Sequence, residues 1–312
     1  MKKIAITFGD PNGISPEITI KALNFLDLPR DKVVLFTSKN ILEFYKEKYD
    51  LYLEKDYEIF EIPYNKSDIK CGVETQESGE FAFRAIKDAC EYAVNKKIDA
   101  IVTAPVSKNA LKLAGHDYSG QTEIIEQYIA KTTQKAEMLF VCDKFNVLLF
   151  TRHVALRDVS QYITKENIIE KIVNLNDSLK NQLGINNPRI AMCALNPHAG
   201  EKGMFGDEEV NEIIPAIFAL QQKGINIEGP FPSDSLFTTC LGYECEYDCY
   251  VAMYHDQGLI PVKLMERDNC VNTTIGLDIL RTSPAHGTAF DIAGQNIANA
   301  NSMIEAIELA IR

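Results

Sequence analysis

The sequence predicts an α/β protein built from two α/β/α lobes, each with a mostly parallel sheet. Short apolar runs that suit strands alternate with amphipathic segments that suit helices along almost the whole chain, which is typical of parallel strands joined by helical crossovers. The alternation is interrupted once, where residues 137–142 and 146–152 flank Asp143-Lys144-Phe145 as the strands of an antiparallel hairpin would. With 312 residues, the chain is long enough for two lobes.

The individual elements follow from the spacing of apolar residues. The first strand ends at Gly9-Asp10-Pro11, and Ser15 is expected to cap the helix that follows, with Pro16 in its first turn. In chain order, the expected strands are 4–8, 33–37, 57–62, 98–103, 137–142, 146–152, 189–195 and 250–254. The expected helices are 15–25, 41–49, 77–95, 122–130, 166–182, 208–222 and 302–311.

The lobe boundaries are expected close to residues 118 and 256. Residues 1–118 with 257–312 would form the first lobe, which carries both termini, and residues 119–256 would form the second. Two lobes of this kind enclose a cleft, where we expect the active site.

Composition excludes several classes of function. The chain has 32 basic and 44 acidic residues, a net charge of −12, which disfavours a nucleic-acid surface because such surfaces depend on clustered Lys and Arg. Its apolar runs are too short to span a bilayer, and its first residues lack the features of a signal peptide. Eight cysteines are too few for a disulfide scaffold, so we expect reduced thiols in a cytoplasmic protein.

The glycines argue against the two common nucleotide-binding motifs. No two glycines are separated by a single residue, so the Rossmann fingerprint G-x-G-x-x-G is absent. Gly115 and Gly120 have the separation of a P-loop, but Gln121 stands where the lysine would follow. A nucleotide would therefore have to be held in another way.

Three of the five histidines follow apolar runs, namely His153, His198 and His255. Open α/β sheets bind ligands at the carboxyl ends of their strands, and neutral imidazoles there suit a Zn²⁺-type ion. Spacing alone leaves open the alternative that each is a hydrogen-bonded structural residue. Asp256 could orient His255 or act as a general base.

A later segment carries cations. Lys263, Asn272 and Arg281 are spaced nine residues apart, and lysine and arginine are natural partners of phosphate or carboxylate. A solvated surface loop is the alternative. The segment 286–294, which begins at His286 and ends at Gly294, is by itself a glycine-bounded loop.

Several of these runs together resemble one family, the 4-hydroxythreonine-4-phosphate dehydrogenases, or PdxA family. The resemblance extends in family order from residue 4 to about residue 300. The matching runs are Gly9-Asp10-Pro11-Asn12-Gly13-Ile14-Ser15-Pro16-Glu17, Thr103-Ala104-Pro105-Val106-Ser107-Lys108, Leu195-Asn196-Pro197-His198-Ala199-Gly200-Glu201, Gly229-Pro230-Phe231-Pro232-Ser233-Asp234 and Tyr254-His255-Asp256-Gln257-Gly258.

The resemblance implies NAD-dependent oxidation of 4-phosphooxy-L-threonine with decarboxylation to 3-amino-2-oxopropyl phosphate and CO₂, in pyridoxal phosphate biosynthesis. It also implies a fold like that of isocitrate and isopropylmalate dehydrogenases, which bind NAD without the Rossmann glycines. His153, His198 and His255 match the family's ligands for one divalent ion, Zn²⁺, Mg²⁺ or Co²⁺. One ligand comes from the partner subunit in the family, which implies a homodimer with shared active sites.

Other positions are also assigned by the resemblance. Gln121, Thr122, Lys263, Asn272 and Arg281 match substrate-binding positions, and Gln121 replaces the family's usual histidine. Glutamine can donate a neutral hydrogen bond but cannot carry a proton at neutral pH. The cofactor-side candidates are His286, Gly287 and Asp291, and the catalytic candidates are Asp256 and Asp234.

Three alternatives stay open. The substrate could be a related four-carbon phosphorylated acid such as 4-phosphoerythronate. The three histidines alone would also suit a metal-dependent hydrolase. A non-catalytic protein that binds a phosphorylated metabolite is the third.

Overall fold

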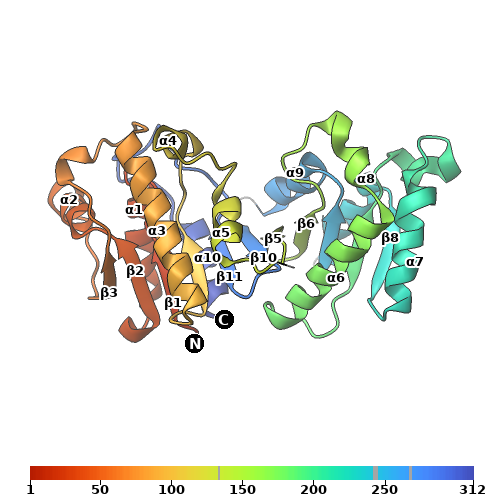
Figure 1. Cartoon of the computed structure of the whole chain (residues 1–312), viewed down its shortest axis with the longest axis horizontal. Helices are drawn as coiled ribbons and strands as arrows, with labels where there is room; N and C mark the ends of the chain where they lie inside the picture. The colour runs from red at the N-terminus through yellow and green to blue at the C-terminus, as the bar shows by residue number, and fades with distance from the viewer. Residues whose placement is uncertain (133, 242–244, 267–268) are drawn as a thin grey trace. The chain divides into compact units, whose positions relative to one another are not determined.

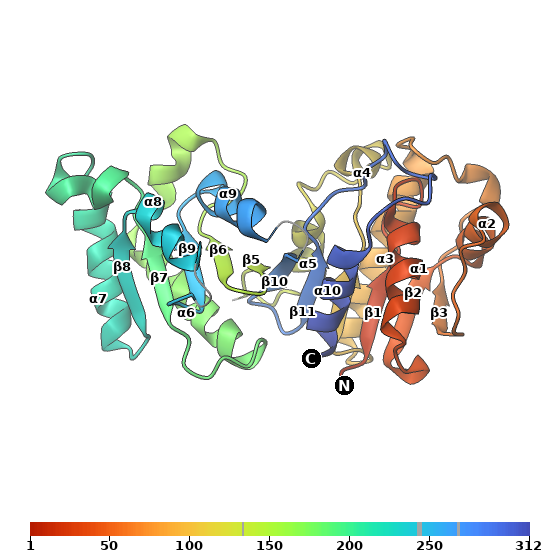
Figure 2. The same cartoon turned by 180° about the vertical axis from the view of Figure 1, so that it is seen from behind.

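The computed structural model describes residues 1–312 except 133, 242–244 and 267–268, and the chain divides into two compact units (Figures 1 and 2). Unit 1 comprises Met1–Ala136 and Val271–Arg312, and unit 2 comprises Glu137–Cys270. Each expected boundary lay one helix too early in the chain. Helix α5 (Gln121–Ile129) packs on α3 (Gln76–Val94) in unit 1, and α9 (His255–Met265) packs on two strands of unit 2.

Unit 1 is a parallel sheet with one antiparallel edge strand. The strand order is β3-β2-β1-β4-β11-β10, and only β10 runs antiparallel to its neighbour β11. Helix α3 packs on β1, β2 and β4, while α10 packs on β11 and β4 and contacts α1. Views from opposite sides show α3 in front of the sheet in Figure 1, and α1 and α10 in front of it in Figure 2, so helices cover both faces. The strands are β1 (Ile4–Thr7), β2 (Val33–Thr37), β3 (Glu58–Glu61), β4 (Ala100–Thr103), β10 (Val271–Ile275) and β11 (Leu280–Pro284). The remaining helices are α1 (Ser15–Leu26), α2 (Lys39–Tyr49), α4 (Lys108–Leu113) and α10 (Asn301–Ile311).

Unit 2 repeats this design with the strand order β5-β6-β9-β7-β8, in which only the β5–β6 pair is antiparallel. Helices α6 and α7 pack on each other, and α9 lies on β6 and β9. The strands are β5 (Glu137–Val141), β6 (Asn146–Leu149), β7 (Ile190–Cys193), β8 (Ile227–Phe231) and β9 (Cys249–Ala252). The other helices are α6 (Lys165–Asn181), α7 (Ile214–Gln222) and α8 (Ser233–Leu236), and a π-helical turn at Glu209–Ile213 precedes α7.

The α/β class, the mostly parallel sheets and the central hairpin are confirmed. The sequence interpretation missed β8, the short helices α4 and α8, helix α9 and the hairpin β10–β11. Helix α9 was hidden by Gly258 and Pro261, which are poor helix formers. Gly258 is required there because a Cβ would lie 2.7 Å from a Leu149 methyl and 2.9 Å from Cβ of Ala252. The lack of a side chain at this position lets the helix approach β6 and β9.

The predicted cap of α1 was wrong. Ile14 is the residue at the cap, and Ser15 lies inside the helix, where its hydroxyl donates a 2.7 Å hydrogen bond to the carbonyl of Pro105. Ser15 therefore connects α1 to the loop after β4 instead of satisfying the free N–H groups of its own helix.

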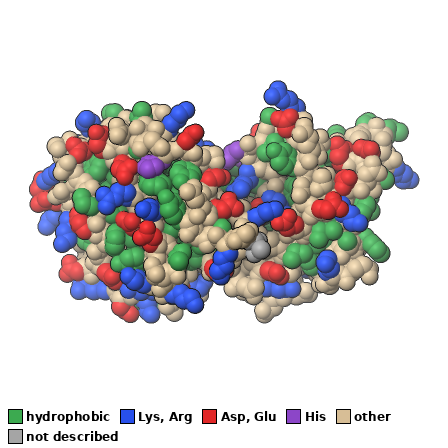
Figure 3. Space-filling model, in the orientation of Figure 1, with side chains coloured by type: hydrophobic (Ala, Val, Ile, Leu, Met, Phe, Trp, Pro, Cys, Tyr) green, Lys and Arg blue, Asp and Glu red, His purple; other side chains and the backbone are tan. Residues whose placement is uncertain are grey.

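The surface carries charged side chains of both signs. Figure 3 shows acidic and basic side chains interspersed on the visible face, without a continuous basic patch there. Among the residues that the structure describes, no helix is long and apolar enough to cross a membrane. All eight cysteines are in the thiol form, as expected.

Candidate active site

In unit 1, the loops after β1 and β4 meet at the point where the strand order reverses. The chain passes outward from β1 to β2 and β3, and then returns to the other side of β1 as β4, and open α/β sheets bind ligands at such a point. Gly9 adopts φ +59° there, and a Cβ would lie 2.3 Å from the carbonyl oxygen of Pro105, so only glycine fits. Asp10 N–H donates to the same carbonyl at 2.9 Å. The motif Gly9–Glu17 therefore packs tightly against the loop that follows β4.

Asp10 carries a buried carboxylate in this motif. One oxygen accepts from the N–H of Asn12 at 2.9 Å and the other from the hydroxyl of Ser78 at 3.2 Å. Burial, with a smaller contribution from the nearby Glu74, raises the pKa of Asp10 to about 6, although the two hydrogen bonds oppose the rise. The folded protein thus holds a proton on Asp10 more tightly than the unfolded chain does.

This raised pKa predicts a specific dependence of stability on pH. Between pH 3.8, the ordinary pKa of an aspartate, and about pH 6, the folded state binds more protons than the unfolded state. The Asp10 contribution to the free energy of unfolding therefore falls as pH rises through this window, by up to about 3 kcal/mol. We expect Asp10→Asn to gain stability relative to the parent protein between pH 4 and pH 7.5, as measured by urea denaturation. Asp56→Asn, at a fully exposed carboxylate, is the control, and a pH-independent difference for Asp10→Asn would contradict the prediction.

Arg281 is the centre of a buried polar cluster in unit 1. Its side chain is 2% exposed, Nε and Nη2 donate to Oγ1 of Thr103 at 2.9 and 2.7 Å, and Nη1 donates to Oγ1 of Thr274 at 3.3 Å. Burial lowers the pKa of Arg281 to about 10, against the opposing effect of Glu123, so the guanidinium stays charged at neutral pH. These hydrogen bonds go to neutral hydroxyls, which leaves the guanidinium suited to an anionic ligand.

Two further predicted substrate residues present buried acceptors. Gln121 begins α5 and donates from Nε2 to the carbonyl of Ala104 at 3.3 Å, next to Thr103. Its Oε1 is buried and has no hydrogen-bond partner among the described residues, and the same holds for Oδ1 of Asn272. In the β10–β11 register Thr274 faces Arg281, and Asn272 faces Ser283. Asn272 and Arg281 therefore lie on the same face of the sheet, because residues two apart share a face. Buried acceptors without donors are costly unless a ligand supplies them.

The alternative of a solvated surface loop is therefore wrong for Asn272 and Arg281, which lie on buried strands of unit 1. Lys263 belongs to unit 2, where it is exposed in the last turn of α9. Thr122, in the first turn of α5, is 3% exposed.

The three cofactor-side candidates are exposed on one loop of unit 1. His286, Gly287 and Asp291 follow β11 and are open to solvent, and a Cβ at Gly287 would meet nothing within 4 Å. The loop is attached through Thr288, whose carbonyl accepts from the N–H of Ile14 at 3.0 Å. The loop therefore lies beside the loop that follows β1, and its residues His286 and Gly287 are open to solvent there.

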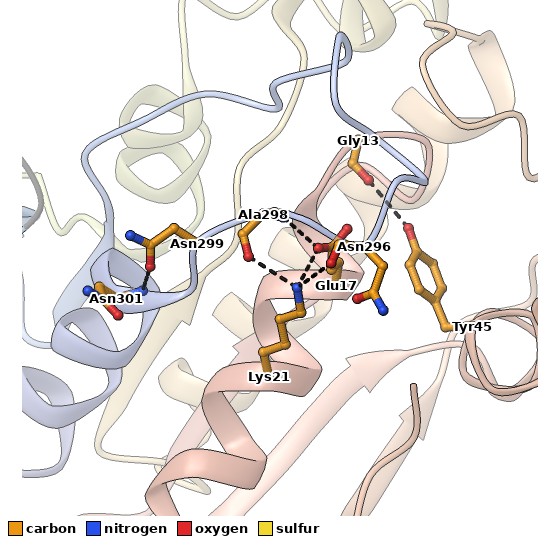
Figure 4. A network of polar contacts seen from close by, with 8 residues as sticks. All are labelled: Gly13, Glu17, Lys21, Tyr45, Asn296, Ala298, Asn299 and Asn301. Carbon is orange, nitrogen blue, oxygen red and sulfur yellow. Dashed lines mark hydrogen bonds and ion pairs between the residues drawn. The ribbon is translucent and has the colours of Figure 1, made fainter. Parts of the chain in front are cut away.

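An ion pair between the buried Glu17 and the half-buried Lys21 holds the far end of this loop (Figure 4). Glu17 is 1% exposed, and its Oε1 accepts from Nζ of Lys21 and from the N–H of Ala298, both at 2.7 Å. Lys21 also donates to the carbonyls of Asn296 and Ala298 at 3.1 and 3.2 Å. The first motif thus orders the cofactor-side loop through side chains of α1. The sequence offered only an acid and a base four residues apart as a signal of this role.

In unit 2, two of the predicted metal ligands lie together. His153 follows β6 and His255 begins α9 directly after β9. Because β6 and β9 are adjacent and parallel, the residues that follow them meet at one edge of the sheet. The two ring centroids are 5.9 Å apart, and both histidines line a cavity of about 360 Å³ that Arg152 and Asp256 also line.

Asp256 contacts the ring of His255, with Oδ1 2.7 Å from Nδ1. A proton on Nδ1 that is donated to Asp256 leaves the lone pair on Nε2, which is the tautomer required to bind a metal through Nε2. Asp234 is exposed at the start of α8. Gln257 connects the start of α8, where Asp234 lies, to the sheet edge that carries His255. Its Nε2 donates to Oγ of Ser233 at 2.7 Å and to the carbonyl of Ala194 at 2.8 Å.

The structure does not bring all three predicted ligands together within one chain. Among the described residues, no group of three or more His, Cys, Asp and Glu side chains could hold a metal ion. His198 is exposed in a turn in which six consecutive residues, from His198 to Gly203, have positive φ. This turn is held by the buried carboxylate of Glu209, which accepts from the N–H groups of Leu195 and Asn196 at 2.8 and 2.7 Å.

Sequence reasoning missed four residues that shape these sites. Thr103 and Gln257 are part of the resemblance motifs but were not singled out, and Glu209 lies just after one. Glu17 lies in the first motif and acts through the backbone of residue 298. Each acts through a contact with a residue distant in the chain, which local pattern does not reveal.

Comparison with known proteins identifies the family. The family model "Pyridoxal phosphate biosynthetic protein PdxA" matches residues 5–310. A 4-hydroxythreonine-4-phosphate dehydrogenase from Sulfurihydrogenibium sp. is 41% identical, over 100% of this chain and 98% of that protein. A D-threonate 4-phosphate dehydrogenase from Pectobacterium atrosepticum is 38% identical, over 100% and 99% of the two chains.

Solved structures agree with this assignment. The crystal structure of a 4-hydroxythreonine-4-phosphate dehydrogenase from Klebsiella pneumoniae has a TM-score of 0.86 at 36% identity, covering 100% of this chain and 99% of that chain. An isocitrate dehydrogenase from Methylococcus capsulatus shares the fold, with a TM-score of 0.52 at 14% identity and coverage of 100% and 85%, as the resemblance implied. The chain therefore belongs to the PdxA family, and it is an oxidoreductase of the dehydrogenase type.

Proposed function

We propose that the protein oxidises 4-phosphooxy-L-threonine with NAD⁺ and decarboxylates the resulting β-keto acid to 3-amino-2-oxopropyl phosphate and CO₂, in pyridoxal phosphate biosynthesis. The buried Arg281 cluster carries this proposal. A guanidinium bonded to Thr103 and Thr274, with the buried acceptors of Gln121 and Asn272 in the same unit, suits a small ligand that has both anionic groups and O–H or N–H donors.

In this proposal, residues of unit 1 bind and orient the substrate. Arg281 binds its phosphate or carboxylate, while Gln121 and Asn272 accept hydrogen bonds from its hydroxyl or amine. From unit 2, Lys263 is the candidate in this proposal for a second positive charge toward an anionic group. Fixing these groups aligns the reacting C–H bond and reduces the entropic cost of reaction.

The histidine pair accounts for two of the three proposed metal ligands. His153 and His255 present two imidazoles to one cavity, and the contact of Asp256 with Nδ1 of His255 keeps Nε2 available as a ligand. A divalent ion, Zn²⁺, Mg²⁺ or Co²⁺, would supply Lewis-acid polarisation of the substrate oxygen. His198 is the ligand that a second copy of the chain would contribute, so the proposal includes a homodimer with shared sites. Asp256, with Asp234 as the alternative, would assist proton transfer.

The exposed loop fits the cofactor. His286 and Gly287 offer an uncovered ring and an open backbone edge for the adenosine part, and Asp291 offers a carboxylate for hydroxyl groups. NAD⁺ would supply the hydride acceptor. The chain would hold it through the loop that Ile14 and Glu17 order. We place this enzyme in the cytoplasm.

A second candidate substrate is D-threonate 4-phosphate, which has a hydroxyl where 4-phosphothreonine has an amine. Two observations favour it, namely relatives of that name at 38% and 39% identity and the neutral Gln121 where the family's usual residue is histidine. It belongs to the same class of four-carbon phosphorylated acids as 4-phosphoerythronate.

The test is the formation of NADH, followed by absorbance, with each of the three phosphorylated acids and titrated Zn²⁺, Mg²⁺ or Co²⁺. We expect the highest kcat/KM with 4-phosphothreonine and with NAD⁺ in place of NADP⁺. Preference for D-threonate 4-phosphate would establish the second candidate. Substrate consumption that does not require NAD⁺ would instead indicate a metal-dependent hydrolase, and binding without turnover would contradict both dehydrogenase proposals.

A further inference from the structure

Two cysteines lie side by side near the two ends of unit 2. Cys142 follows β5, and Cys270 is the last residue of the unit. Both are in the thiol form, and their sulfur atoms are 3.1 Å apart, with the Cys142 thiol donating to the Cys270 sulfur. Although 128 positions separate them in the chain, no large displacement is needed to bring the two sulfurs within bonding distance.

A second contact holds the same two segments together. Nδ2 of Asn269 donates to Oδ2 of Asp143 at 3.2 Å, so residues 142–143 pair with residues 269–270 through two successive side-chain contacts. The thiols differ in access, because Cys142 is half-buried whereas Cys270 is 2% exposed. One thiol can therefore meet a small reagent, and the other is placed to react with it afterwards.

We propose that Cys142 and Cys270 form a reversible intramolecular disulfide by exchange with a small-molecule disulfide such as oxidised glutathione. Cys142 loses its proton to solvent, and its thiolate attacks one sulfur of the reagent, which releases one glutathione thiolate and leaves a mixed disulfide. Cys270 then loses its proton and attacks the sulfur of Cys142, which releases the second glutathione. The two protein thiols lose two electrons, and the reagent disulfide gains them as it becomes two thiols.

The surroundings set the rate of this exchange. The hydrogen bond with Cys270, burial and the nearby carboxylates of Glu266 and Asp143 all raise the pKa of the Cys142 thiol. Little thiolate is present at neutral pH, so exchange is slow there and accelerates as the pH rises. The pair is thus stable as thiols under reducing conditions and reacts on prolonged exposure to oxidant.

The cross-link would close a loop that contains nearly all of unit 2. A disulfide stabilises a fold mainly by restricting the unfolded chain, and the effect increases with the length of the closed loop. We therefore expect the oxidised protein to unfold at a higher temperature than the reduced protein, and a thiol reductant to reverse the difference.

The experiment uses the full chain, incubated with oxidised glutathione at pH 8.5 and quenched with a thiol-blocking reagent. Peptide mapping without reduction should join the peptides of Cys142 and Cys270 with a loss of about two mass units, the two thiol hydrogens. Cys270→Ser should instead accumulate a mixed disulfide on Cys142, and Cys142→Ser should leave Cys270 unmodified. Cys71→Ser, at a half-buried thiol of unit 1, is the matched control and should cross-link as the parent does.

Two results would overturn the proposal. One is a stable mixed disulfide on Cys142 in the parent protein without the cross-link. The other is an unmodified Cys142 under conditions that modify Cys71. The cross-link depends on neither metal nor NAD⁺, so its outcome is independent of the proposed function.

Discussion

Replacement of Arg281 by methionine should lower kcat/KM for the phosphorylated substrate by roughly 10²- to 10⁴-fold, since two charge-assisted hydrogen bonds to an anion contribute about 3–5 kcal/mol together. The side chain is 2% exposed and is bonded to hydroxyls of Thr103 and Thr274, so solvent cannot replace it. The loss should appear mainly in KM if the anion is bound equally in the ground state and the transition state. Steady-state kinetics measure it.

The fold of this variant should survive. Burial of a cation is costly, as the lowered pKa of Arg281 indicates, and an apolar side chain of similar volume is often tolerated at such a site. Thermal unfolding should therefore show a Tm close to that of the parent. Arg281→Lys keeps the charge but not the planar fork, and should give an intermediate loss. Arg189→Met, at an exposed arginine of unit 2, is the control. A parental KM for Arg281→Met would remove Arg281 from substrate binding.

Replacement of His255 by alanine should abolish binding of the divalent ion and reduce turnover to the level of the chelator-treated parent. His255 shares a cavity with His153 and is oriented by Asp256, so its loss leaves one imidazole where two lay together. Equilibrium dialysis with Zn²⁺ or Co²⁺ measures binding without recourse to activity. His116→Ala, at a histidine of unit 1 that stacks on Phe83 and contacts Glu80, should bind the ion as the parent does. Parental affinity in His255→Ala would refute the assignment.

Mixed dimers test which ligand crosses between subunits. If His198 completes the site of a second chain, His198→Ala and His255→Ala homodimers are both inactive, but subunits mixed after dissociation form dimers with one intact site. Random mixing should then restore about a quarter of the parental activity. No recovery would mean that all three histidines act within one chain.

Local pattern was sufficient for most strands and long helices, because apolar runs of four to six residues and helical periodicity are properties of short segments. It failed at Val271–Ile275 and Leu280–Pro284. These strands are buried but rich in Asn, Thr, Ser and Arg, since they enclose the Arg281 cluster, and buried polar strands lack the apolar signal. Helix α9 was missed because Gly258 serves close packing, not helix propensity. Both failures lie beside candidate functional residues, where local preferences are most often overridden.

By itself, the sequence determined the α/β class, the order of most elements and the polar residues that follow the strands, because all of these depend on neighbours along the chain. Only the tertiary structure decided which of those residues meet. It placed β9 between β6 and β7, so that His255 lies beside His153 although they are 102 positions apart in the chain. It also placed Arg281, for which a surface loop was the alternative, in the interior as a buried cation. The physical reason is that strand order is selected by the packing of whole sheets and helices, a long-range property that no local spacing records.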